Sequence, residues 1–252
     1  TAHAALAMCE ILDLCDGLFT AAEEESLKAA LREKGMVPCL RFCERVQREH
    51  THINNWYNVL LMGYGACALL LEDGQAVEKT LLLLRDSYSL YNSDSYGESV
   101  QYSNYATLTL SHLHELILRL RPDLANRVDL SCYARLMDWY AASFLYRKPW
   151  DDETVFPRTL NFADSAAIFR PTGDVLVQVA VRMKEILPRQ AALAAWLFET
   201  TYAQPEQGPD ELATFGFFNQ FRYHAVLMQP DMAAARSPAR AGLCEALCFE
   251  NG

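Results

Sequence analysis

Apolar residues recur with the spacing of an α-helix along almost the whole chain, and this pattern constrains the fold more than any other feature. The stretches that follow it are 4–18, 20–49 (with an interruption expected at 35–38), 54–71, 75–90, 98–120 and 130–147. Further helices are expected near 174–187, 190–201 and 209–221. Alternation of polar and apolar residues, typical of a half-buried strand, is absent before the last ten residues. The sequence therefore predicts an all-α protein built from helical hairpins.

Composition and charge exclude several classes of protein. With 252 residues, of which 51% are apolar and 21% charged, the chain has the composition of a globular protein with a sizeable core. A net charge of −10 argues against a general nucleic-acid binder, which needs a basic stripe. The longest apolar run, 59–71, contains glycines and is too short to cross a membrane.

Eight cysteines raise the question of disulfides or a metal site. Cys39 and Cys43 are spaced by one helical turn, as are Cys244 and Cys248, unlike the C-x2-C pattern of zinc sites. A buried free thiol packs as a small hydrophobic group, and we interpret the cysteines in this way. We expect neither a metal nor a cofactor, and the cysteines leave the redox compartment open.

Two polar segments each open a long predicted helix. The first, 91–105, reads Y-N-S-D-S-Y-G-E-S-V-Q-Y-S-N-Y, and the second, 50–56, reads H-T-H-I-N-N-W. In the first, Glu98, Tyr102 and Tyr105 stand at i, i+4 and i+7, so they share one face of the helix that begins there.

These two helix starts are expected to lie close together. The helices that begin at 54 and 98 are two apart in the series, so in an up-and-down arrangement they run parallel and start at one rim. The loop 148–164, which carries Trp150 and Arg158, follows an antiparallel helix and is expected to return to that rim. Helix N-termini present unpaired N–H groups, which favour an anionic ligand.

The side chains at this rim suit β-elimination from a uronic acid. Asn or His can hydrogen-bond the C6 carboxylate and stabilise the charge that develops when C5 loses its proton. A tyrosine can remove that proton or protonate the departing O4 when its neighbours shift its pKa. Tryptophan and tyrosine faces would supply sugar-stacking surfaces.

The same segments carry a resemblance to a known family. The motifs are N-N-W-Y-N-V-L-L-M-G-Y-G-A-C-A-L-L-L-E-D, then D-S-Y-G-E-S-V-Q-Y-S-N-Y-A, then N-F-A-D-S-A. In this order they resemble the helical domain of the heparinase II/III-like and oligoalginate lyases, polysaccharide lyases with an incomplete (α/α) toroid followed by an antiparallel β-sandwich. The final C-F-E-N-G resembles the first strand of that sandwich. The resemblance covers about 50–252 and implies a toroid over 1–247, with 248–252 beginning a sandwich whose remainder is missing.

The resemblance also implies roles for individual residues. Asn55 matches the asparagine that neutralises the substrate carboxylate, and Asn54 stands beside it. Tyr102 matches the catalytic acid or base, and Tyr105 the second tyrosine of a Y-x-x-Y pair. Glu98 matches the glutamate of a G-x-Y-x-E-G type motif, although serine follows it here in place of glycine.

One departure from the family bears on activity. Many active members have histidine directly after the asparagine, where this chain has Trp56. His52 or His50, in the preceding turn, is the candidate substitute. Substrate binding is the expected role of the remaining candidates, which are Asn54, Trp56, Glu98, Arg158, Trp150 and His50. The family takes a further histidine, and often a second catalytic tyrosine, from the sandwich.

Each candidate also has a structural interpretation. Asn54 fits an N-cap and Glu98 a capping acid, while the tyrosines fit helix-face aromatics with hydrogen-bonded hydroxyls. Tryptophans often serve as core or loop anchors, and Arg158 has Asp151 and Asp152 as alternative partners.

Three functions follow from these alternatives. The first is a polysaccharide lyase that acts on an acidic polysaccharide and works together with its own C-terminal sandwich. The second is an (α/α)-barrel glycoside hydrolase, which needs two facing carboxylates from among Glu98, Asp151, Asp152 and Asp164. The third is a glycan-binding helical domain without activity. The resemblance implies a periplasmic or secreted protein, while free cysteines leave the cytoplasm open.

Overall fold

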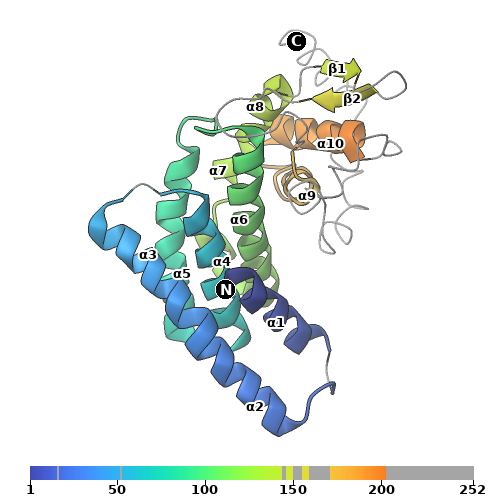
Figure 1. The fold of residues 1–252 in the computed structure, drawn as a ribbon. Helices are drawn as coiled ribbons and strands as arrows, with labels where there is room; N and C mark the ends of the chain where they lie inside the picture. Colours follow the sequence, from blue (N-terminus) through green and yellow to red (C-terminus); the bar gives the residue numbers. More distant parts are fainter. Residues whose placement is uncertain (16, 52, 144–145, 150–154, 159–170, 203–252) are drawn as a thin grey trace. The chain divides into compact units, whose positions relative to one another are not determined.

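Helices account for most of the residues that the structure, a computed structural model, describes (Figure 1). The described residues are 1–15, 17–51, 53–143, 146–149, 155–158 and 171–202. This confirms the all-α prediction in its coarse form. The α-helices are α1 (Ala2–Leu14), α2 (Ala21–Ala30), α3 (Val37–Glu49), α4 (Asn55–Leu70), α5 (Gly74–Ser87), α6 (Val100–Leu120), α7 (Ser131–Ala134), α8 (Leu136–Ser143), α9 (Gly173–Arg182) and α10 (Pro188–Tyr202).

The expected interruption at 35–38 is a change of helix type rather than a break. The backbone continues from α2 through η1 (Leu31–Met36), a π-helical segment, directly into α3. Pro38 stands just after this change of helix type, where it removes one backbone N–H from the continuous helix. At the start of α2, Thr20 forms a capping box with Glu23, as serine or threonine before an acidic first turn favours.

The sequence prediction was wrong for 146–158. It gave a helix to 147 and an irregular loop after it, but β1 (Tyr146–Pro149) and β2 (Val155–Arg158) form an antiparallel pair. Tyr146 pairs with Arg158, and Pro149 with Val155. Strands of four residues are too short for alternation to be visible in the sequence. Each contains a proline, which is tolerated because both strands of a two-stranded sheet are edges.

The chain divides into two compact units, which are described separately. Unit 1 comprises Thr1–Leu90 and His112–Asp129, and unit 2 comprises Tyr91–Ser111 and Leu130–Gly252. In unit 1, α4 packs against α1, α3, α5 and η1, and its side chains are buried on nearly every face. A helix that is apolar all round belongs in the interior, which explains why α4 is the centre of this unit.

Two glycines let other elements of unit 1 approach α4 closely. A Cβ on Gly63 would lie 2.7 Å from the Cα of Ala2, so α1 packs directly on the α4 backbone. A Cβ on Gly65 would lie 2.5 Å from Leu113 Cδ1 and 2.9 Å from Thr80 Cγ2. These contacts leave no room for a methyl group at either position.

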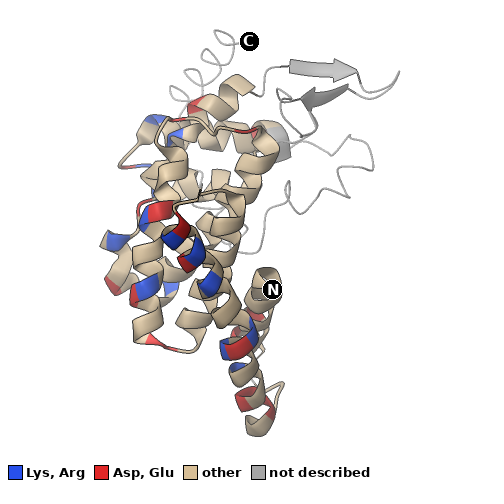
Figure 2. Cartoon of the chain, turned by 60° about the vertical axis from the view of Figure 1, so that its left-hand side comes forward, with Lys and Arg blue, Asp and Glu red and all other residues tan. Residues whose placement is uncertain are grey.

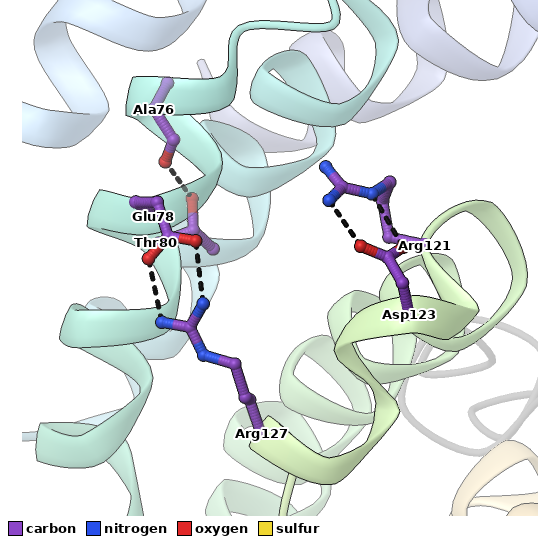
Figure 3. Close-up of polar contacts among 6 residues, drawn as sticks. All are labelled: Ala76, Glu78, Thr80, Arg121, Asp123 and Arg127. Carbon is purple, nitrogen blue, oxygen red and sulfur yellow. Dashed lines mark hydrogen bonds and ion pairs between the residues drawn. The ribbon is translucent and has the colours of Figure 1, made fainter.

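The 3₁₀ segment η3 (Pro122–Arg127) is tied to α5 by polar contacts at the surface of unit 1 (Figure 3). Arg127 binds Glu78 through two parallel hydrogen bonds of 2.7 and 2.8 Å. Arg121 binds Asp123 in the same way, at 2.9 and 2.6 Å. Elsewhere in this unit, acidic and basic residues are interspersed along α2 and α3 and do not form a patch of one sign (Figure 2).

A buried histidine lies in the second half of α6. His114 is completely buried, and the Tyr88 hydroxyl lies 3.4 Å from its Nε2 atom. The same hydroxyl accepts a hydrogen bond from the backbone N–H of Asp129 at 3.1 Å. Burial lowers the pKa of His114 to about 3, because the carboxylates of Asp129 and Glu115 offset the lost hydration only in part. The imidazole is therefore neutral at physiological pH.

Unit 2 is held together by hydrogen bonds between buried polar side chains of the first half of α6 and the helices around it. Ser103 Oγ lies 2.7 Å from the Tyr140 hydroxyl of α8, and Asn104 Oδ1 accepts from the backbone N–H of Thr172 at 3.1 Å. Gln178 of α9 donates to the Ser111 carbonyl at 3.0 Å and accepts from Tyr133. Such satisfied networks fix helix rotation as well as position.

No helix among the described residues is long and apolar enough to cross a membrane.

Candidate functional site

The start of α4 exposes two of the predicted site residues. Asn54 is the N-cap, and its Oδ1 atom accepts a hydrogen bond from the backbone N–H of Trp56 at 3.1 Å. The capping interpretation of Asn54 is therefore confirmed. Its amide nitrogen makes no hydrogen bond to the described part of the chain. Trp56, 58% exposed, is the most exposed aromatic side chain at this helix start, whereas Asn55 is only 6% exposed.

A polar groove lies beside this helix start within unit 1. It has a volume of about 510 Å³ and is formed by the end of α3, the connection to α4 and the end of α5. His50 lines it in a left-handed backbone conformation with φ of 50°, which ends α3. The full lining is Val46, Gln47, His50, Thr51, Ile53, Arg85, Asp86 and Ser89.

This groove contains one exposed cation, Arg85, that can bind an anion. Asp86 is held in the wall, since its Oδ2 atom accepts hydrogen bonds from Gln47 Nε2 at 2.5 Å and from the Tyr57 hydroxyl at 3.1 Å. Arg85 is exposed and forms no ion pair with any described residue. The groove thus offers the guanidinium of Arg85 and the imidazole of His50, while the Asp86 carboxylate keeps its negative charge and is held in place by two neutral donors. A carboxylate or another oxyanion is the ligand that this arrangement suits.

The start of α6, in unit 2, carries the predicted tyrosines. Tyr102 and Tyr105 are partly exposed, while Ser103 and Asn104 between them are buried and anchored by the hydrogen bonds described above. This confirms that Tyr102 and Tyr105 share the less buried face of the first two turns. The prediction that Glu98 shares this helix face was wrong, because α6 begins only at Val100. Burial raises the pKa of Tyr105, so this phenol is protonated at neutral pH and is not available as a base in that form.

Glu98 precedes the first turn of α6 and is partly exposed. The pKa of Tyr96 is raised, mainly by burial and to a smaller extent by the nearby Glu98 carboxylate. Ser99, which stands where the resembling lyases have glycine, is almost completely buried. Its Oγ atom makes no hydrogen bond within the described residues, although its carbonyl accepts from the Ser103 N–H at 3.0 Å. Burial of this hydroxyl without a hydrogen bond therefore lowers the free energy of unfolding.

The two groups of candidates belong to different units. Asn54, Asn55, Trp56 and His50 lie in unit 1, and Glu98, Tyr102 and Tyr105 in unit 2. That they meet at one rim stays a prediction.

Several predicted site residues lie outside the described part of the chain. These are His52, Trp150 and the loop acids Asp151, Asp152 and Asp164. Arg158 ends β2, but only its backbone is described. The expected helix at 209–221 and the expected sandwich strand at 248–252 also lie outside it.

Sequence reasoning missed Arg85, Asp86 and Gln47, which line the groove. A signal for them was present. If α4 runs antiparallel to its neighbours α3 and α5, the ends of both neighbours must meet its start. The charged pair at 85–86 stands at such a helix end, close to the end of the predicted helix 75–90.

Among the described residues, no three His, Cys, Asp or Glu side chains come together in a way that could hold a metal ion. Cys39 and Cys43 are completely buried free thiols, as predicted, whereas Cys15 is exposed, so the prediction was wrong for that residue. Burial raises the pKa of Cys39 to about 11 and that of Cys43 to about 12, which leaves both protonated and unreactive.

Comparisons of the chain with protein families, with curated proteins and with solved structures give no match. The resemblance of its motifs to the polysaccharide lyases therefore stays a hypothesis.

Proposed function

We propose that the chain is the helical part of a polysaccharide lyase, which cleaves a uronate-containing polymer such as alginate or a glycosaminoglycan by β-elimination. In this proposal the helices belong to an incomplete (α/α) toroid, and an antiparallel β-sandwich on the C-terminal side completes the catalytic site. A periplasmic or secreted location goes with such a substrate. The high helical content and the order of the motifs support the proposal.

The observation that carries it is the combination at the start of α4. An indole that is 58% exposed is costly in water and provides a flat surface on which a sugar ring can stack. The amide of Asn54 and the groove with Arg85 and His50 lie next to it in the sequence or the fold. Together they match the two recognition elements of a uronic acid, its ring face and its carboxylate.

The proposed reaction assigns each group a task. Asn54 and Arg85 bind the C6 carboxylate, so that negative charge developing on it is stabilised when C5 loses its proton. The resemblance gives this task to Asn55, but that side chain is only 6% exposed, and the proposal therefore assigns the task to its exposed neighbour Asn54. Tyr102, ionised to its phenolate, removes that proton and becomes a neutral phenol. The C4–O4 bond then breaks as a double bond forms between C4 and C5, and the departing O4 receives a proton. Tyr105, whose phenol is protonated at neutral pH, is assigned this donor role and is left as the phenolate.

An absorbance assay tests the proposal. The full-length protein is mixed with alginate, with a glycosaminoglycan and with the same polymers after chemical reduction of their carboxyl groups. We expect ultraviolet absorbance of the unsaturated uronate to rise with at least one native polymer and with none of the reduced ones. Tyr102→Phe removes the phenol while keeping the ring, and we expect it to lower kcat by about 100-fold or more.

Other outcomes would contradict the proposal in distinct ways. Reducing sugars without new absorbance would indicate a hydrolase. Tight glycan binding by a folded protein without turnover would indicate a binding domain. Unchanged turnover in Tyr102→Phe would refute the role of this tyrosine even if the polymer is cleaved.

A further inference from the structure

Two cysteines from helices far apart in the sequence meet inside unit 1. Cys9 of α1 and Cys67 of α4 are separated by 58 residues, and their Sγ atoms lie 3.8 Å apart. Both are free thiols, with Cys9 only 6% exposed and Cys67 completely buried. At this distance the two sulfurs are in direct contact, with no atom between them.

The backbones of these helices are also close. A Cβ on Gly63, one turn before Cys67, would lie 2.7 Å from the Cα of Ala2 in α1. A disulfide requires Cα atoms roughly 4.4–6.8 Å apart and a sulfur–sulfur bond of about 2.0 Å. This backbone contact lies one turn from Cys67 and about two turns from Cys9, so the two helices are already packed closely near the sulfurs, and side-chain rotation with a shift of α1 would bring them to bonding distance.

From this contact we propose that Cys9 and Cys67 are a site of oxidative cross-linking, at which a disulfide joins α1 to α4. The inference is independent of the proposed lyase activity, because neither thiol belongs to the groove or to the start of α6.

The local environment identifies which thiol reacts first. The Cys9 S–H donates a hydrogen bond to Cys67 Sγ, and this donation lowers the pKa of Cys67. The same bond, followed by burial, raises the pKa of Cys9. Cys67 is therefore the sulfur that forms the thiolate, which is the reactive species in thiol oxidation.

With hydrogen peroxide as oxidant the steps balance. The Cys67 thiolate attacks one peroxide oxygen and the O–O bond breaks. This step releases hydroxide and forms a sulfenic acid on Cys67. Hydroxide takes the Cys9 proton and becomes water. The Cys9 thiolate then attacks Cys67 Sγ, the S–O bond breaks, and the departing hydroxide takes up a proton from solvent. In sum, two thiols and one peroxide give one disulfide and two waters.

A groove provides a path for so small an oxidant. It has a volume of about 310 Å³, lies between α1 and the α2–η1 segment, and is lined by Ala5, Leu31 and Gly35 among others. A Cβ on Gly35 would lie 3.2 Å from Cys67 Sγ, so the sulfur lies directly behind this glycine. Gly35 and Ala5, which both line the groove, therefore lie close to the Cys67 thiol, and an oxidant in the groove has only a short distance to cover.

The test treats the reduced full-length protein, carrying Cys15→Ser to remove an exposed thiol, with hydrogen peroxide. Remaining thiols are then alkylated under denaturing conditions and the peptides are mapped by mass spectrometry. We expect a linked pair of peptides that contain Cys9 and Cys67, a loss of two hydrogen atoms from the intact mass, and reversal by a reductant. The midpoint of thermal unfolding should rise by about 5–15 °C.

Matched variants separate this pair from general oxidation. Cys39→Ala removes a buried thiol of the same unit and should leave the cross-link intact, whereas Cys67→Ala should abolish both the linked peptides and the rise in the unfolding midpoint. In the unmodified protein, oxidation of the exposed Cys15 shows that peroxide has acted. If Cys9 and Cys67 are then both recovered in alkylated form, the proposal is overturned. Linkage of either residue to a different cysteine would overturn it as well. The peptide map of the unmodified protein does not depend on any variant folding.

Discussion

The close packing of α1 on α4 predicts that Gly63→Ala destabilises the protein, although alanine is the better helix former. The added Cβ would lie 2.7 Å from Ala2 Cα, 2.8 Å from Ala2 Cβ and 3.2 Å from the Ala2 carbonyl oxygen. Carbon atoms in contact prefer about 3.5–4.0 Å, so the overlap is about 1 Å. Two of the three opposing atoms belong to the backbone, which cannot rotate away. Helix α1 must therefore move.

The magnitude follows from two opposing terms. Overpacking of a core typically costs about 1–3 kcal/mol, and more when a backbone has to shift. Replacing glycine by alanine in a helix returns about 0.5–1 kcal/mol. We therefore expect a net loss of about 1–2 kcal/mol in the free energy of unfolding, or more if the buried Leu6 loses its contacts.

Equilibrium unfolding in urea, followed by far-ultraviolet circular dichroism, measures this loss. Gly74→Ala is the matched control, because Gly74 opens α5 and an added Cβ would meet nothing within 4 Å. We expect the control to be unchanged or stabilised by up to about 1 kcal/mol. A Gly63→Ala variant as stable as the control would refute the packing of α1 on α4 described here.

Three further predictions concern other parts of the molecule. Below about pH 6.5 the free energy of unfolding should fall by up to about 1.4 kcal/mol per pH unit on account of His114, because the unfolded histidine binds a proton that the folded one, whose pKa is lowered to about 3, does not bind. His114→Gln should flatten this slope in acid titrations followed by fluorescence. Ser99→Ala should stabilise the protein by about 1 kcal/mol in urea unfolding, since it removes a buried hydroxyl that lacks a partner among the described residues; a loss of stability would reveal a bond to the hydroxyl. Asn54→Asp keeps the capping oxygen of α4 but replaces the amide nitrogen by a charged oxygen, so we expect unchanged stability and a KM for uronate polymers raised about tenfold or more. Equal kinetics in Asn54→Asp and the parent would exclude carboxylate binding by this amide.

The helices could be predicted because each buries an apolar stripe, and the stripe repeats with the period of the helix. The predicted 54–71 and 75–90 match α4 and α5 within a few residues. The strands β1 and β2 could not be predicted in this way, because their pairing depends on two four-residue segments meeting in space. Hydrogen bonds between strands leave little trace in so short a pattern.

The candidate site could be predicted only in part, for a similar reason. The capping role of Asn54 is local, since it depends on one residue and the helix that follows, and the sequence was sufficient for it. Whether Asn55 or its neighbour faces solvent depends on how α4 is rotated against its partners, and the buried residue proved to be Asn55. The contribution of Arg85 depends on helix ends that meet through tertiary packing.

The central claim is that the chain belongs to an enzyme that eliminates rather than hydrolyses, and the most direct measurement follows the oxygen of water. The full-length protein should digest a uronate polymer in water enriched in heavy oxygen, with the products analysed by mass spectrometry. Elimination predicts chain ends that carry a double bond and no heavy oxygen. Products that contain heavy oxygen and no double bond, or a folded protein that cleaves no uronate polymer at all, would contradict the account.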